Sequence, residues 1–531
     1  MSAQTYDFII VGAGSAGAAI ANRLTANGRH RVLLLEAGRE SHPWSRIPVG
    51  FAKLINNPKA NWLFASEPEE STGGRHIPVP RGKLLGGSSS INGMVFVRGQ
   101  ALDYDTWAQL GNRGWSYQDV LPIFREMEDY DGGDPEYRGR GGPLKVSDLN
   151  EYGPLYDALY AAAEEIGIKR NPDYNGAEQD GIGMTQATIR RGRRMSTAYC
   201  YLEPARGRAN LSIVAGAHSE GLLLEGTRCT GVAYRVGGQR LEARAAREVI
   251  LSAGSVGSPQ LLELSGIGQP ELLQGLGIEV RHALPGVGEN LRDHYAPRML
   301  WRVVRPGISY NHMGRGLGAI RQGLRYAFTG DGLLGLPAAP IRMYVRTREG
   351  LNSADVGISV IPFLATSDYK LAKQWGLTMI THPLRSESTG SIHIATADPM
   401  APPAIRFNFL ASEIDRDATV EGMRIVRRLM NATPMKGILG EEMAPGPSVE
   451  SDEALLDWVK AHAETTYHPI GTCKMGSDPR AVVDDRLRVH GIERLRVADA
   501  SIMPTLTSGN TNAPSIMIGE KAARMLLEDA A

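Results

Sequence analysis

The chain has 531 residues, more than one hydrophobic core usually serves, so two or three domains are expected. It carries 58 basic and 58 acidic residues, and this zero net charge argues against a nucleic-acid-binding protein. Cys200, Cys229 and Cys473 are far apart in the sequence and form no CxxC pair, so neither a metal site nor a disulfide framework is expected.

The start of the chain lacks the basic segment of a signal peptide, and the apolar residues 8–11 run straight into glycines. No segment reaches the ~20 apolar residues that a transmembrane helix needs. With so few cysteines, these features indicate a cytoplasmic protein. Peripheral contact with the inner face of the cytoplasmic membrane stays open, and the sequence does not indicate an oligomeric state.

Residues 6–36 have the pattern of a strand–helix–strand unit. Residues 6–11 form a short apolar run, 12–17 a glycine-rich turn, 18–26 a segment of helical periodicity, and 31–36 a second strand rich in Leu and Val. Such uninterrupted apolar runs are typical of strands that are buried on both faces, which indicates a parallel sheet.

Further elements are expected beyond this unit. Residues 40–100 are mostly irregular and include a glycine-serine-rich loop at 82–99, and a loop of this length is usually functional. Helices are expected at residues 102–128, 153–167, 258–265, 413–431, 453–465 and 514–529. Strands are expected at residues 211–214, 231–235, 248–251, 356–362, 390–395 and 495–497, with an antiparallel sheet between about 298 and 410.

The turn after the first strand carries the spacing GxGxxG of dinucleotide-binding proteins. Gly12 permits a tight turn, Gly14 lets the backbone approach a pyrophosphate, and Gly17 lets helix and strand pack closely. N–H groups at the start of the helix favour the negative phosphates. Glu36 ends the second strand 19 residues after Gly17, where a carboxylate can accept both ribose hydroxyl groups and disfavours a 2′-phosphate. The motif therefore indicates an ADP-containing ligand but does not distinguish FAD from NAD.

Four separated segments carry a resemblance to a known family. They are the unit at 6–36, the segment PRGKLLGGSSSING at 80–93, the segment GSVGSPQLLELSGIG at 254–268, and the set HPIGT, VADAS and GNTNAP within 468–514. They resemble, in the same order, the motifs of the glucose-methanol-choline (GMC) oxidoreductases. Within this family the sequence looks most like bacterial choline dehydrogenase and aliphatic alcohol dehydrogenase members.

The resemblance implies FAD as cofactor and an α/β fold of two parts. One is a Rossmann-like FAD-binding domain of the GMC and p-hydroxybenzoate-hydroxylase type, at about residues 1–150, 200–297 and 470–531. The other is an α+β substrate domain with an antiparallel sheet and helices, at about residues 151–199 and 298–469.

The resemblance also implies which residues contact FAD. The loop at 86–95 should run beside the isoalloxazine ring, and Ser219 should contact adenine through its backbone. Asp499 and Ala500 should meet the pyrophosphate or the ribityl chain. Residues 510–512 should lie at the pyrimidine edge, where the start of the last helix can stabilise negative charge on the reduced ring. The full expected set is Gly12, Gly14, Ser15, Ala16, Gly17, Glu36, Ala37, Trp62, Leu85, Gly86, Gly87, Ser90, Asn92, Gly93, Met94, Val95, Ser219, Ala253, Gly254, Asp499, Ala500, Asn510, Thr511 and Asn512.

Two positions in this part of the chain need separate comment. Some family oxidases carry a histidine, bonded covalently to the flavin, where this sequence has Ile91. Isoleucine cannot form that bond, so non-covalent FAD is expected. Trp62 either approaches the active site or packs in the core.

Oxidation of an alcohol by a flavin needs a base for the hydroxyl proton and transfer of a hydride to flavin N5. Histidine suits the first task. His468 begins HPIGT and matches the active-site histidine of the family, although a core histidine bonded to backbone is the alternative. Asn510 matches a position that holds Asn or His and can donate to the substrate oxygen, although Gly509-Asn510 is also a common turn.

Other polar groups are interpreted as structural. His294 matches a family stretch, but nothing in the sequence assigns it a role in proton transfer. His462 and Glu464 are expected on a helix end that faces solvent. The arginine cluster at 190–194 is expected to be a solvated loop.

The expected reaction is oxidation of a primary alcohol to an aldehyde, with re-oxidation of the flavin by a quinone-type acceptor or oxygen. An apolar alcohol is preferred over choline, because no aromatic cage for a quaternary ammonium group can be located, and aromatic alcohols stay open. Residues 333–340 either line a tunnel for the alcohol or pack as a loop on the core. Residues 317–328 are amphipathic and form either a membrane contact or an ordinary surface helix.

Three other classes of protein remain as alternatives. They are a nicotinamide dehydrogenase, a lyase that keeps FAD on the same fold without net redox chemistry, and a catalytically idle flavin-binding protein. The presence of both His468 and Asn510 argues against the idle protein.

Overall fold

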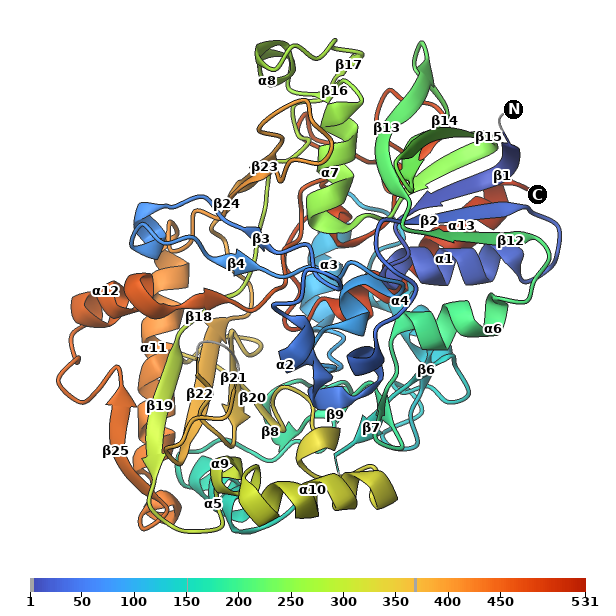
Figure 1. Ribbon diagram of the computed structural model, residues 1–531. Coiled ribbons are helices and arrows are strands. Elements are labelled where there is room, and N and C mark those ends of the chain that lie inside the picture. Colours follow the sequence, from blue (N-terminus) through green and yellow to red (C-terminus); the bar gives the residue numbers. More distant parts are fainter. Residues whose placement is uncertain (1–3, 150, 367–369) are drawn as a thin grey trace.

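The strand–helix–strand unit at the start of the chain forms the middle of a seven-stranded sheet, seen at the upper right of Figure 1 in this computed structural model. The structure describes residues 4–149, 151–366 and 370–531. The strand order is β12 (Leu211–Ala215), β2 (Val32–Glu36), β1 (Gln4–Val11), β15 (Gln239–Leu251), β14 (Arg228–Val236) and β13 (His218–Glu225), with β27 (Leu495–Val497) pairing the end of β15. β12, β2, β1, β15 and β27 run parallel, whereas β13 and β14 form an antiparallel edge.

Helix α1 (Ser15–Thr25) begins at the glycine turn and packs against α13 (Asn512–Asp529) from the other end of the chain. All five residues of β2 are buried, as expected for a strand inside a parallel sheet. The core around this sheet is continuous and draws on residues 6–146, 200–287 and 470–526. The last helix is therefore part of the same body as the first turn.

A second sheet has its own core. Its six strands are antiparallel, in the order β25 (Leu439–Ala444), β19 (Arg298–Val303), β22 (Gly376–Pro383), β21 (Val356–Ile361), β20 (Ile341–Val345) and β8 (Gly181–Met184). Helix α11 (Glu413–Asn431) covers β21 and β22 and contacts α5 (Pro154–Glu165). The α/β architecture with an α+β second part is therefore confirmed.

Side chains of the second sheet alternate between two faces. On β20, Ile341, Met343 and Val345 enter the core beneath α11. Arg342 lies between them in sequence and therefore faces the other way, toward the first sheet, where it lines a cavity.

The remaining elements are short or peripheral. The helices are α2 (Phe51–Leu54), α3 (Ala101–Gln109), α4 (Tyr117–Met127), α6 (Glu203–Ala205), α7 (Gly254–Leu264), α8 (Pro270–Gly275), α9 (Tyr310–Met313), α10 (Gly316–Thr329) and α12 (Asp452–His462). The strands are β3 (Phe64–Ala65), β4 (Pro78–Val79), β5 (Glu128–Asp129), β6 (Leu144–Lys145), β7 (Ser147–Asp148), β9 (Gln186–Ala187), β10 (Ile189–Arg190), β11 (Arg193–Arg194), β16 (Ile267–Gly268), β17 (His282–Ala283), β18 (Tyr295–Ala296), β23 (Ser391–His393), β24 (Ala404–Arg406) and β26 (Glu464–Thr465).

Several expected elements differ from the structure. The single helix expected at 102–128 is two helices, α3 and α4, because Gly111 and Gly114 between them adopt positive φ angles that interrupt a helix. The helix expected at 453–465 ends at His462, and the next residues pair with β18 as β26. The strand expected at 390–395 is β23, which forms a hairpin with β24 outside the six-stranded sheet.

Among the described residues, no helix is both long and apolar enough to cross a membrane.

Candidate functional site

A cavity of about 1030 Å³ is lined by residues of both sheets. It extends from the glycine turn after β1 to the face of β20, β21 and β22 that carries Arg342. Most of the residues expected to contact a cofactor or substrate line it. They are Gly12, Gly14, Ser15, Ala16, Glu36, Ala37, Trp62, Gly87, Asn92, Gly93, Met94, Val95, Ser219, Ala253, Gly254, His468, Asp499, Ala500, Asn510, Thr511 and Asn512.

Four of the expected residues, Gly17, Leu85, Gly86 and Ser90, lie behind the cavity wall. Gly17 lies at the contact of α1 with the turn, where a Cβ atom would come within 2.0 Å of Gly12 O. Ser90 Oγ donates to Leu85 O at 2.8 Å, and Gly86 has a φ angle of 85°. These residues hold the loop in shape rather than line the cavity.

The glycine turn closes against β15. Gly12 has a φ angle of 99°, and a Cβ atom there would lie 2.4 Å from Ser252 O. Ser15, the first residue of α1, donates from Oγ to Asn512 Oδ1 at 2.7 Å. The starts of α1 and α13 therefore meet at the cavity, and both helix N-termini favour negative charge there.

Glu36 ends β2 with its carboxylate held by backbone. Oε2 accepts from Ala13 N at 3.1 Å and Oε1 accepts from Gly38 N at 2.8 Å. Burial raises the pKa of Glu36 to about 7, although the two N–H donors oppose this rise. The carboxylate is thus fixed beside the glycine turn, where the sequence predicts an adenosine site.

Asp499 lines the cavity, but its carboxylate is already occupied. Oδ2 accepts from Gly254 N at 2.8 Å and from Ser258 Oγ at 2.6 Å. The side chain therefore anchors the start of α7, and only its remaining surface can meet a ligand.

Trp62 lies at the cavity wall, which is one of the two expected alternatives. Its ring stacks on Phe64 at a centroid distance of 5.6 Å, and Lys83 Nζ lies 4.2 Å from its centroid. The segment at 333–340 also reaches the cavity, through Leu333, Leu334, Ala338 and Ala339.

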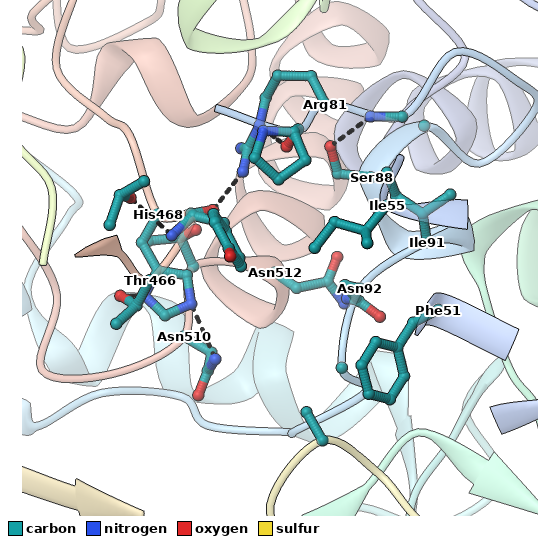
Figure 2. Close-up of a pocket in the computed structure, with 18 of the residues that line it drawn as sticks. Phe51, Ile55, Arg81, Ser88, Ile91, Asn92, Thr466, His468, Asn510 and Asn512 are labelled. Atoms are coloured by element: carbon teal, nitrogen blue, oxygen red, sulfur yellow. Dashed lines mark hydrogen bonds between the residues drawn. The ribbon is translucent and has the colours of Figure 1, made fainter. Parts of the chain in front are cut away.

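His468 and Asn510 meet inside the cavity, as Figure 2 shows. Asn510 Nδ2 donates to His468 Nε2 at 2.8 Å. His468 is 8% exposed, and the preceding Tyr467 adopts a φ angle of 71°, which is rare for a bulky residue. The backbone N–H of His468 donates to Asp293 Oδ1 at 2.9 Å, which fixes the segment.

The protons of His468 can be assigned from its neighbours. His294 Nε2 lies 2.8 Å from Leu384 O, which can only accept, so this nitrogen carries a proton. In neutral His294 the other nitrogen, Nδ1, is then an acceptor, and it lies 3.0 Å from His468 Nδ1. His468 Nδ1 must therefore donate, and its Nε2 keeps the lone pair that accepts from Asn510 Nδ2.

Electrostatics favour the neutral form of both histidines. Burial foremost lowers the pKa of His294 to about 4. Burial also lowers the pKa of His468 well below 6.5, and unfavourable electrostatic interactions with His294, His382, Arg342 and Arg81 would add to the cost of protonating it. The site thus holds an uncharged imidazole in a cavity that also contains arginine side chains.

Some site residues were missed or misread from the sequence. His294 was interpreted as structural, but its ring contacts His468 directly. Glu464 was expected on a solvent-facing helix end, but it lines the cavity, and its Oε2 pairs with Arg298 Nη2 at 2.7 Å. Arg81, Arg342 and His382 line the cavity too, and of these only Arg81 lay in a recognised motif. For Arg342 the only signal was the alternation along β20.

A parallel sheet with a dinucleotide turn, joined at one cavity to a neutral histidine, defines a dinucleotide-dependent oxidoreductase. The sequence profile of GMC oxidoreductases matches residues 6–296 at its N-terminal part and residues 386–519 at its C-terminal part. The chain therefore belongs to the GMC oxidoreductase family, and it is an FAD-dependent oxidoreductase that acts on CH–OH donors.

Among curated proteins, the chain is 41% identical over 527 residues to the oxygen-dependent choline dehydrogenase of Brucella suis biovar 1, covering 98% of this chain and 95% of that protein. It is 42% identical over 532 residues to that of Photobacterium profundum, covering 98% and 93%. Among solved structures, pyridoxine 4-oxidase from Mesorbium loti has a TM-score of 0.90 at 29% identity, covering 98% of this chain and 99% of the other. Formate oxidase has a TM-score of 0.92 at 27% identity, covering 100% and 99%.

The cavity fits FAD by the chemistry of its walls. A Cβ atom on Gly87 would lie 2.8 Å from Gly14 Cα, so the glycine-serine loop approaches the dinucleotide turn as closely as only glycine allows. Glu36 and the start of α1 lie at one end. Ser219 Oγ and Asn510 Oδ1 are buried without a hydrogen-bond partner among the described residues, so both remain free for a polar ligand.

Proposed function

We propose that this protein oxidises a primary alcohol to an aldehyde and that His468 takes the hydroxyl proton. One observation carries the proposal: the lone pair of His468 Nε2 faces the cavity, where it accepts a hydrogen bond from the amide of Asn510, 2.8 Å away. A neutral imidazole so placed is a suitable general base. When bound, FAD supplies the two-electron acceptor for the hydride that leaves the alcohol carbon.

His468 and Asn510 have different roles in the proposed proton transfer. With an alcohol in the cavity, its hydroxyl group replaces the Asn510 amide as the partner of His468 Nε2. Asn510 Nδ2 then donates to the alcohol oxygen and stabilises the negative charge that develops as the proton leaves. His468 Nδ1–H stays bound by His294 and by Thr466 Oγ1, which lies 2.8 Å away.

FAD is held without a covalent bond in this proposal, because Ile91 lines the cavity and has no nucleophilic atom. Glu36, Ala37 and Ser219 form the adenosine end of the site. Residues 87–95 and 510–512 form the flavin end. The FAD-binding domain comprises about residues 1–150, 200–297 and 470–531, which agrees with the extent of the core around the first sheet.

Choline is the second candidate substrate, because the curated relatives above are choline dehydrogenases. Recognition of a quaternary ammonium group needs aromatic faces or a carboxylate. Glu464 supplies a carboxylate in the cavity, but Arg298 already neutralises it. Trp62, Phe64 and Phe363 add aromatic faces to the same lining, so choline remains a candidate that an alcohol screen must test. The names of those relatives make oxygen a candidate acceptor, and a quinone is the other.

A peripheral membrane contact has one candidate surface, on α10 at the lower edge of Figure 1. Leu317, Ile320, Leu324 and Phe328 are 85%, 60%, 54% and 83% exposed, and their spacing places them on one face of the helix. We propose that this face enters the headgroup region of a bilayer. Sedimentation with phosphatidylcholine vesicles should pellet the protein but not the double variant Leu317→Gln/Phe328→Gln. Equal pelleting of the two would contradict the proposal.

The purified holoprotein tests the function with its own flavin as the reporter. Primary alcohols of the aliphatic, aromatic and amino classes are mixed with it anaerobically, and oxygen or a quinone is then added. We expect at least one class to bleach the flavin absorbance and one acceptor to restore it. A flavin that no alcohol bleaches would indicate a lyase or an idle protein, and a preparation without flavin absorbance would indicate a nicotinamide enzyme.

A further inference from the structure

The wall of the cavity opposite the glycine turn carries an unusual cation. Arg342 is 5% exposed and lines the cavity from β20. Its Nη1 donates to Ser359 Oγ at 2.5 Å, and its Nη2 lies 3.4 Å from Tyr344 Oη. Within the described part of the chain, no carboxylate lies within 4 Å of this guanidinium, and its Nε has no hydrogen-bond partner.

Other buried arginines of this protein have better partners. Arg98 and Arg138 share the buried carboxylate of Glu128, at 2.7 and 2.9 Å. Arg194, which lacks a carboxylate, donates to Ser89 O at 3.1 Å and to Asn92 Oδ1 at 2.7 Å. Carboxylates and carbonyl oxygens stabilise a buried guanidinium far better than hydroxyl groups do, so Arg342 is the poorly compensated member of this set.

The strand register gives Arg342 few polar neighbours. Ser359 pairs with Arg342 on the neighbouring strand β21, and Ile380 pairs with Ser359 on β22, on the same face as Thr378. His382, on that face of β22 as well, contacts His294 at a ring-centroid distance of 4.5 Å, and His294 contacts His468. Arg342 lies near enough for its charge to disfavour the His468 cation. The guanidinium therefore lies in the part of the cavity where the alcohol would react.

We infer that Arg342 binds an anionic group of the substrate, so the alcohol carries a carboxylate. A carboxylate in the cavity would supply the counterion that the chain does not provide and would match the planar N–H groups of the guanidinium. This inference rests on the proposed function, because it concerns the substrate class of the same site. The inference also predicts that choline is a poor substrate, since its fixed positive charge would be repelled by Arg342.

The wild-type holoprotein gives the first test, with alcohols that differ only in charge. ω-Hydroxyalkanoates are compared with n-alkanols of the same chain length and with choline, through the rate of anaerobic flavin bleaching at neutral pH. We expect kcat/KM to be at least about tenfold higher for the carboxylate than for the neutral alcohol, and lowest for choline. Equal values, or a preference for choline, would overturn the inference while leaving alcohol oxidation intact.

A binding measurement separates this inference from the proposed reaction. An n-alkanoate and its amide are titrated into the holoprotein while the flavin spectrum is followed. The alkanoate should bind at least about tenfold more tightly than the amide, whether or not any alcohol is oxidised. If no alcohol bleaches the flavin, the proposed function fails, and this titration still decides the role of Arg342.

Variants test whether Arg342 causes the preference for an alkanoate over its amide. Arg342→Met should reduce the ratio of alkanoate to amide affinity about tenfold or more, and Arg342→Lys should keep part of it. Arg346→Met is the matched control, because Arg346 follows on the same segment but is exposed and pairs with Asp180 at 2.6 Å. A ratio that survives in Arg342→Met, or that falls equally in Arg346→Met, would refute the assignment. Should Arg342→Met fold poorly, the wild-type comparison and Arg342→Lys still decide.

Discussion

His294 and His468 face each other through their Nδ1 atoms, 3.0 Å apart, with His294 held on its far side by Leu384 O. This contact fixes the proton of His468 on Nδ1 and leaves Nε2 unprotonated, as the acceptor for Asn510 Nδ2. His294 is thus a positioning residue, which acts on the alcohol only through His468.

Replacing His294 by Phe should remove the acceptor that holds this tautomer. We expect kcat to fall about 10- to 100-fold with a smaller change in KM, since the hydrogen bond orients a reacting imidazole. His294→Asn, whose side-chain oxygen can still accept from Nδ1, should restore part of the rate. A purely structural role would predict loss of flavin or of folded protein instead, and no rescue by Asn.

Asn510→Ala should remove the donor to the alcohol oxygen. Loss of one such donor costs roughly 10²–10³ in kcat, so the rate constant of anaerobic flavin bleaching should fall by this factor. The flavin content should stay near that of the wild type, since other residues line the same cavity. A bleaching rate within twofold of the wild type would show that Asn510 does not contact the reacting oxygen.

Acid precipitation tests the mode of FAD attachment. Because Ile91 offers no atom for a covalent bond, all the flavin should appear in the supernatant, and a yellow pellet would contradict this.

Glu36→Gln should weaken FAD binding about 10- to 100-fold, the effect of losing a hydrogen bond to a charged group. Equilibrium dialysis against free FAD measures this change.

The pH dependence of the reaction follows from the environment of His468. Burial, then the neighbouring charges, lower the pKa of His468 well below 6.5, and a base is active only above its own pKa. We therefore expect kcat/KM to stay level from about pH 8 down to 6.5 and to fall only in more acidic solution. Flavin retention at each pH is the control, because burial raises the pKa of Glu36 to about 7. Half-loss of kcat/KM at or above pH 6.5, with flavin retained, would argue against His468.

The sequence was most informative where local pattern and chemistry coincide. Gly12 and Gly17 could be interpreted one by one, because a Cβ atom on Gly12 would lie 2.4 Å from Ser252 O and one on Gly17 would lie 2.0 Å from Gly12 O. Helix α11 occupies 413–431, the range that its apolar periodicity predicts. His468 and Asn510 were assigned by family motifs, and no local pattern alone would have brought them to one cavity.

What the sequence did not reveal depends on contacts between distant segments. Arg342 differs from a surface arginine only in the face of β20 on which it lies, and that face is set by pairing with β21. Glu464 was expected at a helix end but lies at the cavity wall, because the chain after His462 pairs with β18. The role of His294 required Leu384, 90 residues away, to fix its proton.

The measurement that bears most directly on the account is anaerobic stopped-flow bleaching of the flavin in wild-type protein and in His468→Ala, with the best alcohol from the substrate screen. The account predicts a fall of at least about 10²-fold in the rate constant, the usual contribution of a general base, with an unchanged flavin spectrum before mixing. A variant that bleaches at nearly the wild-type rate would show that another group takes the hydroxyl proton.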